Sequence, residues 1–206
     1  MFLLGVAGGS GSGKTTFAHK IMQRVDRPDV VLLHQDSYYL ATPQLDHQVH
    51  GEPNFDHPEA FDWPLLRTHL AALKRGENIR APIYDFKTSR RLAETQTIGP
   101  CRVLMFEGIY ALWDDEIRRL MDLRVYLHVD ADIRFIRRLH RDVRERSRTL
   151  DSIIRQYYDT VRPMHRQFLE PTQQYADISV GEETDLAADV LAAQVRERVL
   201  VAQNAR

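Results

Sequence analysis

The chain has 206 residues, of which 43% are hydrophobic and 28% are charged, and its formal net charge is −1. This balance is typical of a globular domain that buries a core without help from metals or disulfides. The low net charge disfavours nucleic-acid binding by bulk electrostatics, and no apolar run approaches the roughly 20 residues needed to cross a bilayer. Cys101 has no second cysteine to pair with. We therefore expect one domain over residues 1–206, cytoplasmic, binding neither nucleic acid nor membrane.

In chain order, apolar runs typical of strands alternate with helical patterns. Residues 2–7 predict a buried strand, 14–24 a helix and 30–33 a second strand, and a polar loop follows over 35–62. Residues 63–74 predict an amphipathic helix. Further strands are predicted at 79–86, 94–98, 102–106, 124–129 and 176–180, and further helices at 132–146, 150–169 and from 185 onward.

This alternation predicts an α/β fold with a doubly wound, mostly parallel sheet. The paired strands over 79–98 are separated by a basic turn at Lys87 to Arg91 and predict a small β flap. The helices over 134–160 are rich in arginine and predict a lid. The sequence contains no internal repeat and no interdomain linker.

The segment from Gly8 to Thr15 matches G-x-x-x-x-G-K-[ST], the P-loop pattern, between a predicted strand and a predicted helix. Glycines allow successive backbone N–H groups to face phosphate oxygens, and the helix directs its positive end at the same anion. Lys14 is expected to reach the β- and γ-phosphates, and Thr15 to bind Mg²⁺. The alternative is a flexible turn without a ligand. The predicted ATP-binding residues here are Gly8, Gly9, Ser10, Gly11, Ser12, Gly13, Lys14, Thr15 and Thr16.

Two acidic residues are expected beside this loop. Glu107 ends a buried strand and is placed to hold Mg²⁺, directly or through water. Asp36 follows the second strand, where a carboxylate can accept a proton from an attacking hydroxyl. Together with Thr15, these acids form the predicted metal site. No guanine-reading Asn/Thr-Lys-x-Asp motif occurs, which favours a kinase over a GTPase.

Ten arginines lie between Arg134 and Arg166. Arg134, Arg138 and Arg141 are spaced to share one helical face, from which they could neutralise charge on transferring phosphates. The alternative is a solvated helical face balanced by acids such as Asp142.

Seven motifs follow in order from about residue 3 to residue 180: GGSGSGKTT, QDSYY, NFDHPEAFD, PIYDF, FEGIYAL, DADIRFIRRLHRDVRER and PTQQYAD. In these motifs the chain resembles the uridine-cytidine kinase family, within the group that includes phosphoribulokinase and pantothenate kinase. This resemblance implies transfer of phosphate from ATP to the 5′-hydroxyl of uridine or cytidine. It also implies a homotetramer. The sequence leaves open whether GTP can replace ATP.

Residue by residue, the resemblance implies that Asp36 is the base and that Lys14 and Arg138 take part in catalysis. It assigns the lid arginines Arg141 and Arg146 to the phosphates. The implied nucleoside-binding residues are Asp56, Tyr84, Phe86, Ser89, Arg138, Arg148 and Gln156. On spacing alone, Tyr84 and Phe86 could simply pack the flap, Asp56 could form a turn and Gln156 could be solvated.

The sequence departs from the family pattern at two places. Ser89 stands where many members have a histidine facing the pyrimidine, so the preference between uridine and cytidine stays open. Glu182 and Glu183 stand in a stretch that is usually basic, which leaves only Asp185 as a weak candidate on the adenine side. Alternatives are a kinase for nicotinamide riboside, pantothenate or a sugar phosphate, and a nucleotide-binding regulator without catalysis.

Overall fold

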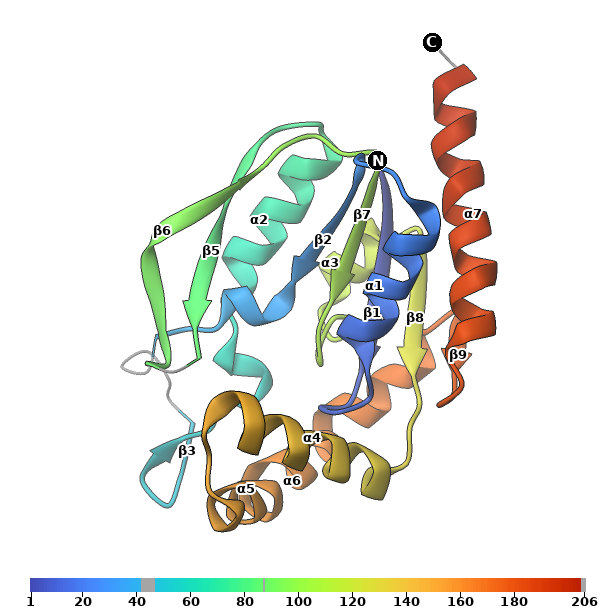
Figure 1. Ribbon diagram of the computed structural model, residues 1–206. Helices are drawn as coiled ribbons and strands as arrows, with labels where there is room; N and C mark the ends of the chain where they lie inside the picture. Colours follow the sequence, from blue (N-terminus) through green and yellow to red (C-terminus); the bar gives the residue numbers. More distant parts are fainter. Residues whose placement is uncertain (42–46, 87, 205–206) are drawn as a thin grey trace.

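The computed structural model describes residues 1–41, 47–86 and 88–204, and its centre is a five-stranded parallel sheet (Figure 1). The strand order is β2-β7-β1-β8-β9. In register, Leu4 of β1 lies between Met105 of β7 and Leu123 of β8. The strands are β1 (Phe2–Gly8), β2 (Val30–His34), β7 (Val103–Glu107), β8 (Leu123–Leu127) and β9 (Ile178–Val180). The predicted doubly wound α/β fold is confirmed.

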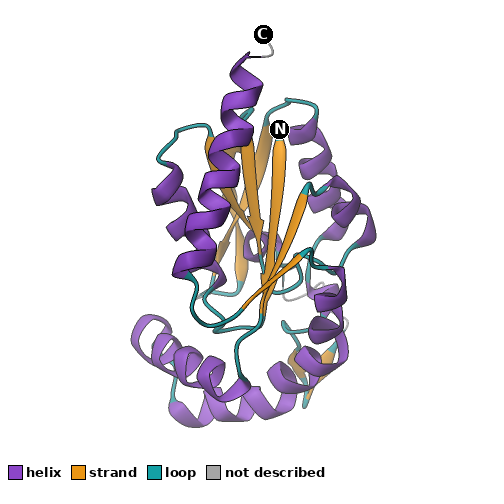
Figure 2. Cartoon of the chain, turned by 90° about the vertical axis from the view of Figure 1, so that its right-hand side faces the viewer, coloured by secondary structure: helices purple, strands orange, loops and turns teal. Residues whose placement is uncertain are grey.

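Helices cover both faces of this sheet (Figure 2). Leu4 and Val6 of β1 belong to the core under α1 (Lys14–Val25) and α7 (Asp185–Asn204). Leu3 and Ala7 belong to the opposite core, which packs against α2 (Trp63–Lys74) and α3 (Asp115–Leu120). Alternate side chains of a strand point to opposite faces, so an apolar strand without alternation is buried on both sides. No described helix is long and apolar enough to span a membrane.

The remaining elements surround the carboxyl ends of the strands. β5 (Ile79–Asp85) and β6 (Arg90–Ile98) form an antiparallel hairpin, and β3 (Gln48–Val49) and β4 (Glu52–Pro53) form a shorter one. The helix α4 (Ala131–Arg146) crosses beneath the sheet (Figure 1). It is followed by α5 (Leu150–Gln156), the π-helical turn η4 (Tyr157–Val161), α6 (Arg162–Met164), the π-helical turn η5 (His165–Leu169) and the 3-10 segment η6 (Glu170–Tyr175). Two further 3-10 turns are η1 (Gln35–Tyr38) and η3 (Pro58–Ala60).

Several predicted boundaries were wrong. β6 begins at Arg90 rather than at residue 94, because Arg90 and Arg91 pair with Asp85 and Tyr84. The basic turn is therefore shorter, and Lys87 lies outside the described residues. The helix predicted over 150–169 is α-helical to Gln156, and the rest consists of two π-helical turns separated by the short helix α6. The last strand begins at residue 178 rather than 176, and the sequence analysis missed α3 and the β3–β4 hairpin.

Candidate active site

The phosphate loop connects β1 to α1 in a conformation that requires glycine. Gly11 and Gly13 have φ angles of 82° and 90°, which side chains with a Cβ rarely adopt. A Cβ on Gly11 would lie 2.2 Å from the carbonyl oxygen of Arg134, and one on Gly9 would lie 2.5 Å from the Nη1 atom of Arg134. The glycines therefore shape a concave backbone that suits a phosphate, and they also let Arg134 pack against the loop.

Lys14 starts α1 and is buried beneath the loop. Its Nζ donates to the carbonyl oxygen of Gly9 at 3.2 Å. Burial lowers the pKa of Lys14, although the negative charges of Glu107 and Asp36 act in the opposite direction. The ammonium group therefore depends on the two acids, or on phosphate oxygens, for its charge balance.

Glu107 ends β7 as a buried carboxylate, and its Oε1 has two partners. The Thr15 hydroxyl donates to it at 3.0 Å, and His34 Nδ1 lies 2.7 Å away. Burial opposes ionisation of Glu107, but the hydrogen bond from His34 and the charge of Lys14 outweigh it and lower the pKa. A hydroxyl and an ionised carboxylate side by side form a hard oxygen pair, the kind of donor set that fits Mg²⁺.

Asp36 lies in η1, just past the end of β2, and differs from Glu107. Among the described residues no hydrogen-bond donor reaches its carboxylate. Burial and the charge of Glu107 raise its pKa, while Lys14 and two lid arginines lower it by a smaller amount. A carboxylate without fixed donors and with a raised pKa is suited to accept a proton.

These residues open onto a cavity of about 1270 Å³, which we call the catalytic cavity, between the phosphate loop, the β5–β6 hairpin and the lid helices. Lys14, Thr15, Asp36 and Glu107 line one end of it. Its wall also contains most of the residues that the sequence analysis assigned to phosphate or nucleoside, namely Ser10, Asp56, Tyr84, Phe86, Ser89, Arg138, Arg141, Arg146, Arg148 and Gln156. The predicted residues outside this wall are Gly8, Gly9, Gly11, Ser12, Gly13 and Thr16.

A chain of hydrogen bonds runs from the phosphate loop to Asp56 through the lid. Arg138 donates to the Ser10 hydroxyl and to Gln156 Oε1, both at 2.9 Å. Gln156 Nε2 then donates to Asp56 Oδ2 at 3.1 Å, and the Thr160 hydroxyl donates to the same oxygen at 2.7 Å. The other oxygen, Asp56 Oδ1, has no hydrogen-bond donor among the described residues. One oxygen of Asp56 is thus held by the lid, and the other is left for a ligand.

Four lid arginines surround the carboxylate of Asp142, which is completely buried. Arg141 is the nearest, with Nη2 at 2.8 Å from Asp142 Oδ1. Arg138 lies at 3.5 Å, and Arg146 and Arg148 lie at 3.7 Å. One buried negative charge therefore orients four positive charges that face the catalytic cavity, and a net positive charge remains for phosphate oxygens.

Aromatic side chains form the wall opposite the lid. The Tyr84 ring lies 5.3 Å from the rings of Tyr39 and of Phe86. The Arg146 guanidinium lies over the Phe86 ring at 4.7 Å, which joins the lid to the β5–β6 hairpin. Ser89 hydrogen-bonds Tyr84 and has a left-handed backbone with φ of 53°.

The sequence analysis missed four residues that organise this site. His34 contacts Glu107, and its register position opposite Glu107 on the neighbouring strand is the signal that could have shown it. Thr160 lies one helical turn after Gln156, a spacing that could have suggested a shared face. Asp142 was considered only as a solvated counter-ion. Arg91 anchors the β5–β6 hairpin by donating to the carbonyl oxygens of Tyr38 and Tyr39 and to Asp62.

Arg134, Arg138 and Arg141 lie on one continuous helix, as their spacing predicted, but Arg134 does not line the catalytic cavity with the other two. Arg134 is buried on the same helix but lines a different cavity, because its side chain turns back to the carbonyl oxygen of Val129.

The acidic residues after β9 are bound by basic side chains of neighbouring helices. Glu182 pairs with Arg137. Asp185 is bound by Lys20 and Arg24 of α1.

Comparison with known proteins places this geometry in a family. Residues 3–187 match the family described as phosphoribulokinase / uridine kinase. A uridine kinase of Deinococcus deserti is 47% identical over 200 residues, covering 96% of this chain and 97% of the relative. A uridine kinase of Lactobacillus helveticus is 47% identical over 197 residues, covering 94% and 93%. The structure of phosphoribulokinase from Rhodobacter spheroides shares the fold, with a TM-score of 0.63, 14% identity and coverage of 87% and 69%. The chain belongs to the phosphoribulokinase / uridine kinase family.

Proposed function

We propose that this chain transfers the γ-phosphoryl group of ATP to the 5′-hydroxyl of a pyrimidine ribonucleoside, uridine or cytidine, and so forms the nucleoside monophosphate. The observation that carries the proposal is one continuous cavity with the phosphate loop at one end, Asp56 and aromatic rings at the other, and Asp36 in its wall. The near full-length similarity to proteins named uridine kinase supports the same reaction.

In this mechanism Asp36 accepts the proton of the 5′-hydroxyl as the hydroxyl oxygen attacks the γ-phosphorus, and the bond from that phosphorus to the bridging oxygen breaks to release ADP. The raised pKa of Asp36 makes its carboxylate a stronger base than an exposed aspartate. Lys14, Arg138 and the lid arginines Arg141 and Arg146 hold the phosphate oxygens and stabilise charge in the transition state. Closure of the lid over the cavity keeps water from competing with the nucleoside hydroxyl.

The nucleoside is positioned by the far end of the cavity. Asp56 Oδ1 accepts hydrogen bonds from the ribose hydroxyls, while Oδ2 stays bound to the lid. The rings of Tyr84 and Phe86 pack against the pyrimidine. Arg148, Gln156 and Ser89 are the polar side chains of this wall that we assign to the base.

We propose that Mg²⁺ is held by Thr15, Glu107 and Asp36. The oxygen donors of Thr15 and Glu107, 3.0 Å apart, fit this ion. When bound, the ion supplies positive charge to the phosphate oxygens. His34 keeps the Glu107 carboxylate oriented and ionised.

Steady-state kinetics on an acceptor panel test the reaction directly. Purified protein is supplied with Mg²⁺ and either ATP or GTP, and ADP or GDP release is measured with uridine, cytidine, nicotinamide riboside and pantothenate. We expect stimulation by a pyrimidine nucleoside and the highest kcat/KM with one of the two. Stimulation only by nicotinamide riboside or pantothenate would identify a different kinase of this group. An absence of stimulation by every acceptor would indicate a regulator without catalysis.

We also propose that the enzyme acts in the cytoplasm as a homotetramer, which is what the family resemblance implies. Each chain has a mass of 24.0 kDa. Light scattering coupled to size-exclusion chromatography should therefore give about four times that mass. A mass of one chain or two chains would contradict the tetramer.

A further inference from the structure

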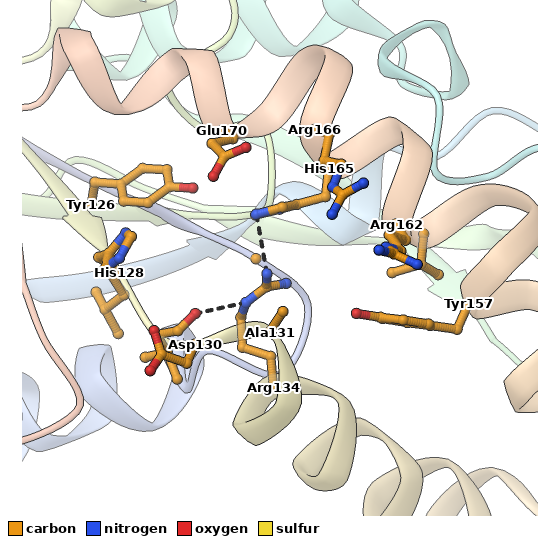
Figure 3. A pocket seen from close by; sticks show the side chains of 14 residues that line it. Tyr126, His128, Asp130, Ala131, Arg134, Tyr157, Arg162, His165, Arg166 and Glu170 are labelled. Carbon is orange, nitrogen blue, oxygen red and sulfur yellow. Dashed lines mark hydrogen bonds between the residues drawn. The ribbon is translucent and has the colours of Figure 1, made fainter.

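A second cavity, of about 210 Å³, lies beside the phosphate loop, between the end of β8, the start of α4 and the segment from η4 to η6 (Figure 3). Gly9 of the phosphate loop forms part of its wall. It shares no lining residue with the catalytic cavity. The side chains around it belong to none of the steps assigned to the reaction.

The central contact of this cavity is between Arg134 and His165. Arg134 Nε donates to the carbonyl oxygen of Val129 at 2.9 Å, and Nη2 lies 3.1 Å from His165 Nε2 (Figure 3). A guanidinium has only donors, so His165 Nε2 must be the acceptor. In the neutral ring the proton is then on Nδ1, which is buried and has no partner. Burial and the positive charge of Arg134 lower the pKa of His165 to about 4, so the ring is neutral at pH 7.

Further donors without partners line the same space. The hydroxyls of Tyr126 and Tyr157 point into it from opposite sides (Figure 3). Neither hydroxyl has a hydrogen bond to another described residue. Arg162 and Arg166 are exposed arginines of this wall, and no described carboxylate lies within ion-pair distance of either one.

The net charge of the cavity wall also favours a negatively charged ligand. Arg134, Arg162 and Arg166 contribute three positive charges to the wall, whereas Asp130 and Glu170 contribute two negative charges. Neither of these acids forms an ion pair with a described residue. The wall therefore carries a small net positive charge, and its groups without partners are the two tyrosine hydroxyls and the two exposed guanidinium groups, which can donate, together with these two carboxylates.

We infer that this cavity is a binding site for a small oxyanion, such as a phosphate or a compact carboxylate, separate from the catalytic cavity. An oxyanion offers several acceptor oxygens, which can take hydrogen bonds from the hydroxyls of Tyr126 and Tyr157 and from the exposed guanidinium groups of Arg162 and Arg166. The volume admits an anion of a few atoms but not a nucleotide, which needs a pocket of roughly 300 Å³ or more.

Such an anion is coupled to the phosphate loop through Arg134. The side chain and backbone of Arg134 pack against Gly9 and Gly11 so closely that a Cβ on either glycine would collide with it. An anion that fixes Arg134 from the other side therefore restricts the loop that binds nucleotide. By thermodynamic reciprocity, the anion then changes nucleotide affinity by the same factor as nucleotide changes anion affinity.

The test uses the full chain saturated with Mg²⁺ and the β,γ-imido analogue of ATP, so that the phosphate loop is already filled. Inorganic phosphate is titrated at constant ionic strength while the ring signals of His165 are followed by NMR. A saturable shift of these signals is expected. This design needs no nucleoside, so its result does not depend on which acceptor the enzyme uses.

Single variants Arg162→Ala and Arg166→Ala should each weaken phosphate binding by about tenfold, since each removes a charge-assisted contact. Arg144→Ala is the matched control, because Arg144 is an exposed arginine of the lid that lines neither cavity. Sulfate and acetate are titrated in parallel, and competition of either with phosphate supports an oxyanion site. His165 signals that respond to none of the three anions, or equal weakening by Arg144→Ala, would overturn the inference.

Discussion

Asp36 at one end of the catalytic cavity and Asp56 and Asp142 at the other differ in how their carboxylates are held. Beside the phosphate loop, Asp36 has no hydrogen-bond donor among the described residues, and its pKa is raised by burial and by Glu107. At the lid end, Asp56 is held by Gln156 and Thr160, and Asp142 is surrounded by arginines. The difference shows that the carboxylate group has two roles in this cavity, as a proton acceptor and as a group that positions other side chains. The carboxylate that must take a proton is left without donors, whereas each of the two that hold other groups in position has one oxygen bound, Asp56 Oδ2 by Gln156 and Thr160 and Asp142 Oδ1 by Arg141.

The largest effect should come from Asp36→Asn, which removes the proton acceptor and keeps the shape of the side chain. We expect kcat to fall by about a thousandfold or more, because the lost basicity affects only the transition state. Nucleotide affinity, measured by calorimetry with the β,γ-imido analogue of ATP, should remain close to that of the unmodified protein. Activity that survives nearly intact would show that Asp36 is not the base.

The raised pKa of Asp36 also predicts two pH effects with definite signs. Because the carboxylate is the active form, kcat/KM should fall as pH decreases through the raised pKa, and this limb should be absent in Asp36→Asn. A folded-state pKa above the unfolded value adds stability only at low pH and loses it as pH rises through the folded pKa. Asp36→Asn should therefore unfold at a higher urea concentration than the unmodified protein at pH 7. A lower midpoint would contradict the pKa direction.

The next largest effect is expected from Asp142→Asn. The change leaves four arginines clustered without their buried counter-charge, which should lower the free energy of unfolding by about 3 kcal/mol. KM for ATP should rise as well, because the arginines lose their common orientation. Urea unfolding and steady-state kinetics measure the two effects. Asp151→Asn, at an exposed acid of the same lid, is the control and should change stability by no more than about 0.5 kcal/mol.

A smaller effect is expected from Thr160→Val, which keeps the shape of Thr160 but removes its hydrogen bond to Asp56. The loss of one such bond is worth about 1 kcal/mol, so KM for the nucleoside should rise about fivefold while kcat changes little. Thr160→Ser keeps the hydroxyl and should behave like the unmodified protein. A fall in kcat with KM unchanged would indicate that Thr160 acts on the chemical step instead.

The fold, and the end of the catalytic cavity beside the phosphate loop, could be predicted from the sequence for a geometric reason. Parallel strands end at the same edge of a sheet, so residues after β1, β2 and β7 had to meet there. Lys14, Asp36 and Glu107 each follow or end one of these strands and do lie together. Here the order of strands and loops was sufficient to predict proximity.

The lid end could not be predicted in the same way, because its contacts depend on irregular backbone. Ser147 adopts a left-handed conformation with φ of 54°, and this turn brings Arg148 close to Asp142. From the sequence pattern alone, Asp142 was considered only as a solvated counter-ion. Thr160 lies in a π-helical turn, whereas the sequence predicted a continuous α-helix through it. Neither turn has a periodic signature, so the contact of Arg148 with Asp142 and the role of Thr160 were missed, although the family resemblance had named Arg148 itself.

An effect of similar size to that of Thr160→Val is expected for substrate specificity at the aromatic wall. Ser89→His restores the side chain that many family members have at this position, and histidine is among the residues that tolerate the left-handed backbone found here. Because one hydrogen bond to the pyrimidine edge is exchanged, the ratio of kcat/KM for uridine to that for cytidine should change by about fivefold. Thr88→His places the same ring on a neighbouring exposed residue that does not line the cavity and should leave the ratio unchanged. If Ser89→His also leaves it unchanged, Ser89 lies outside the base pocket, and discrimination must come from Arg148 or Gln156 at the lid end.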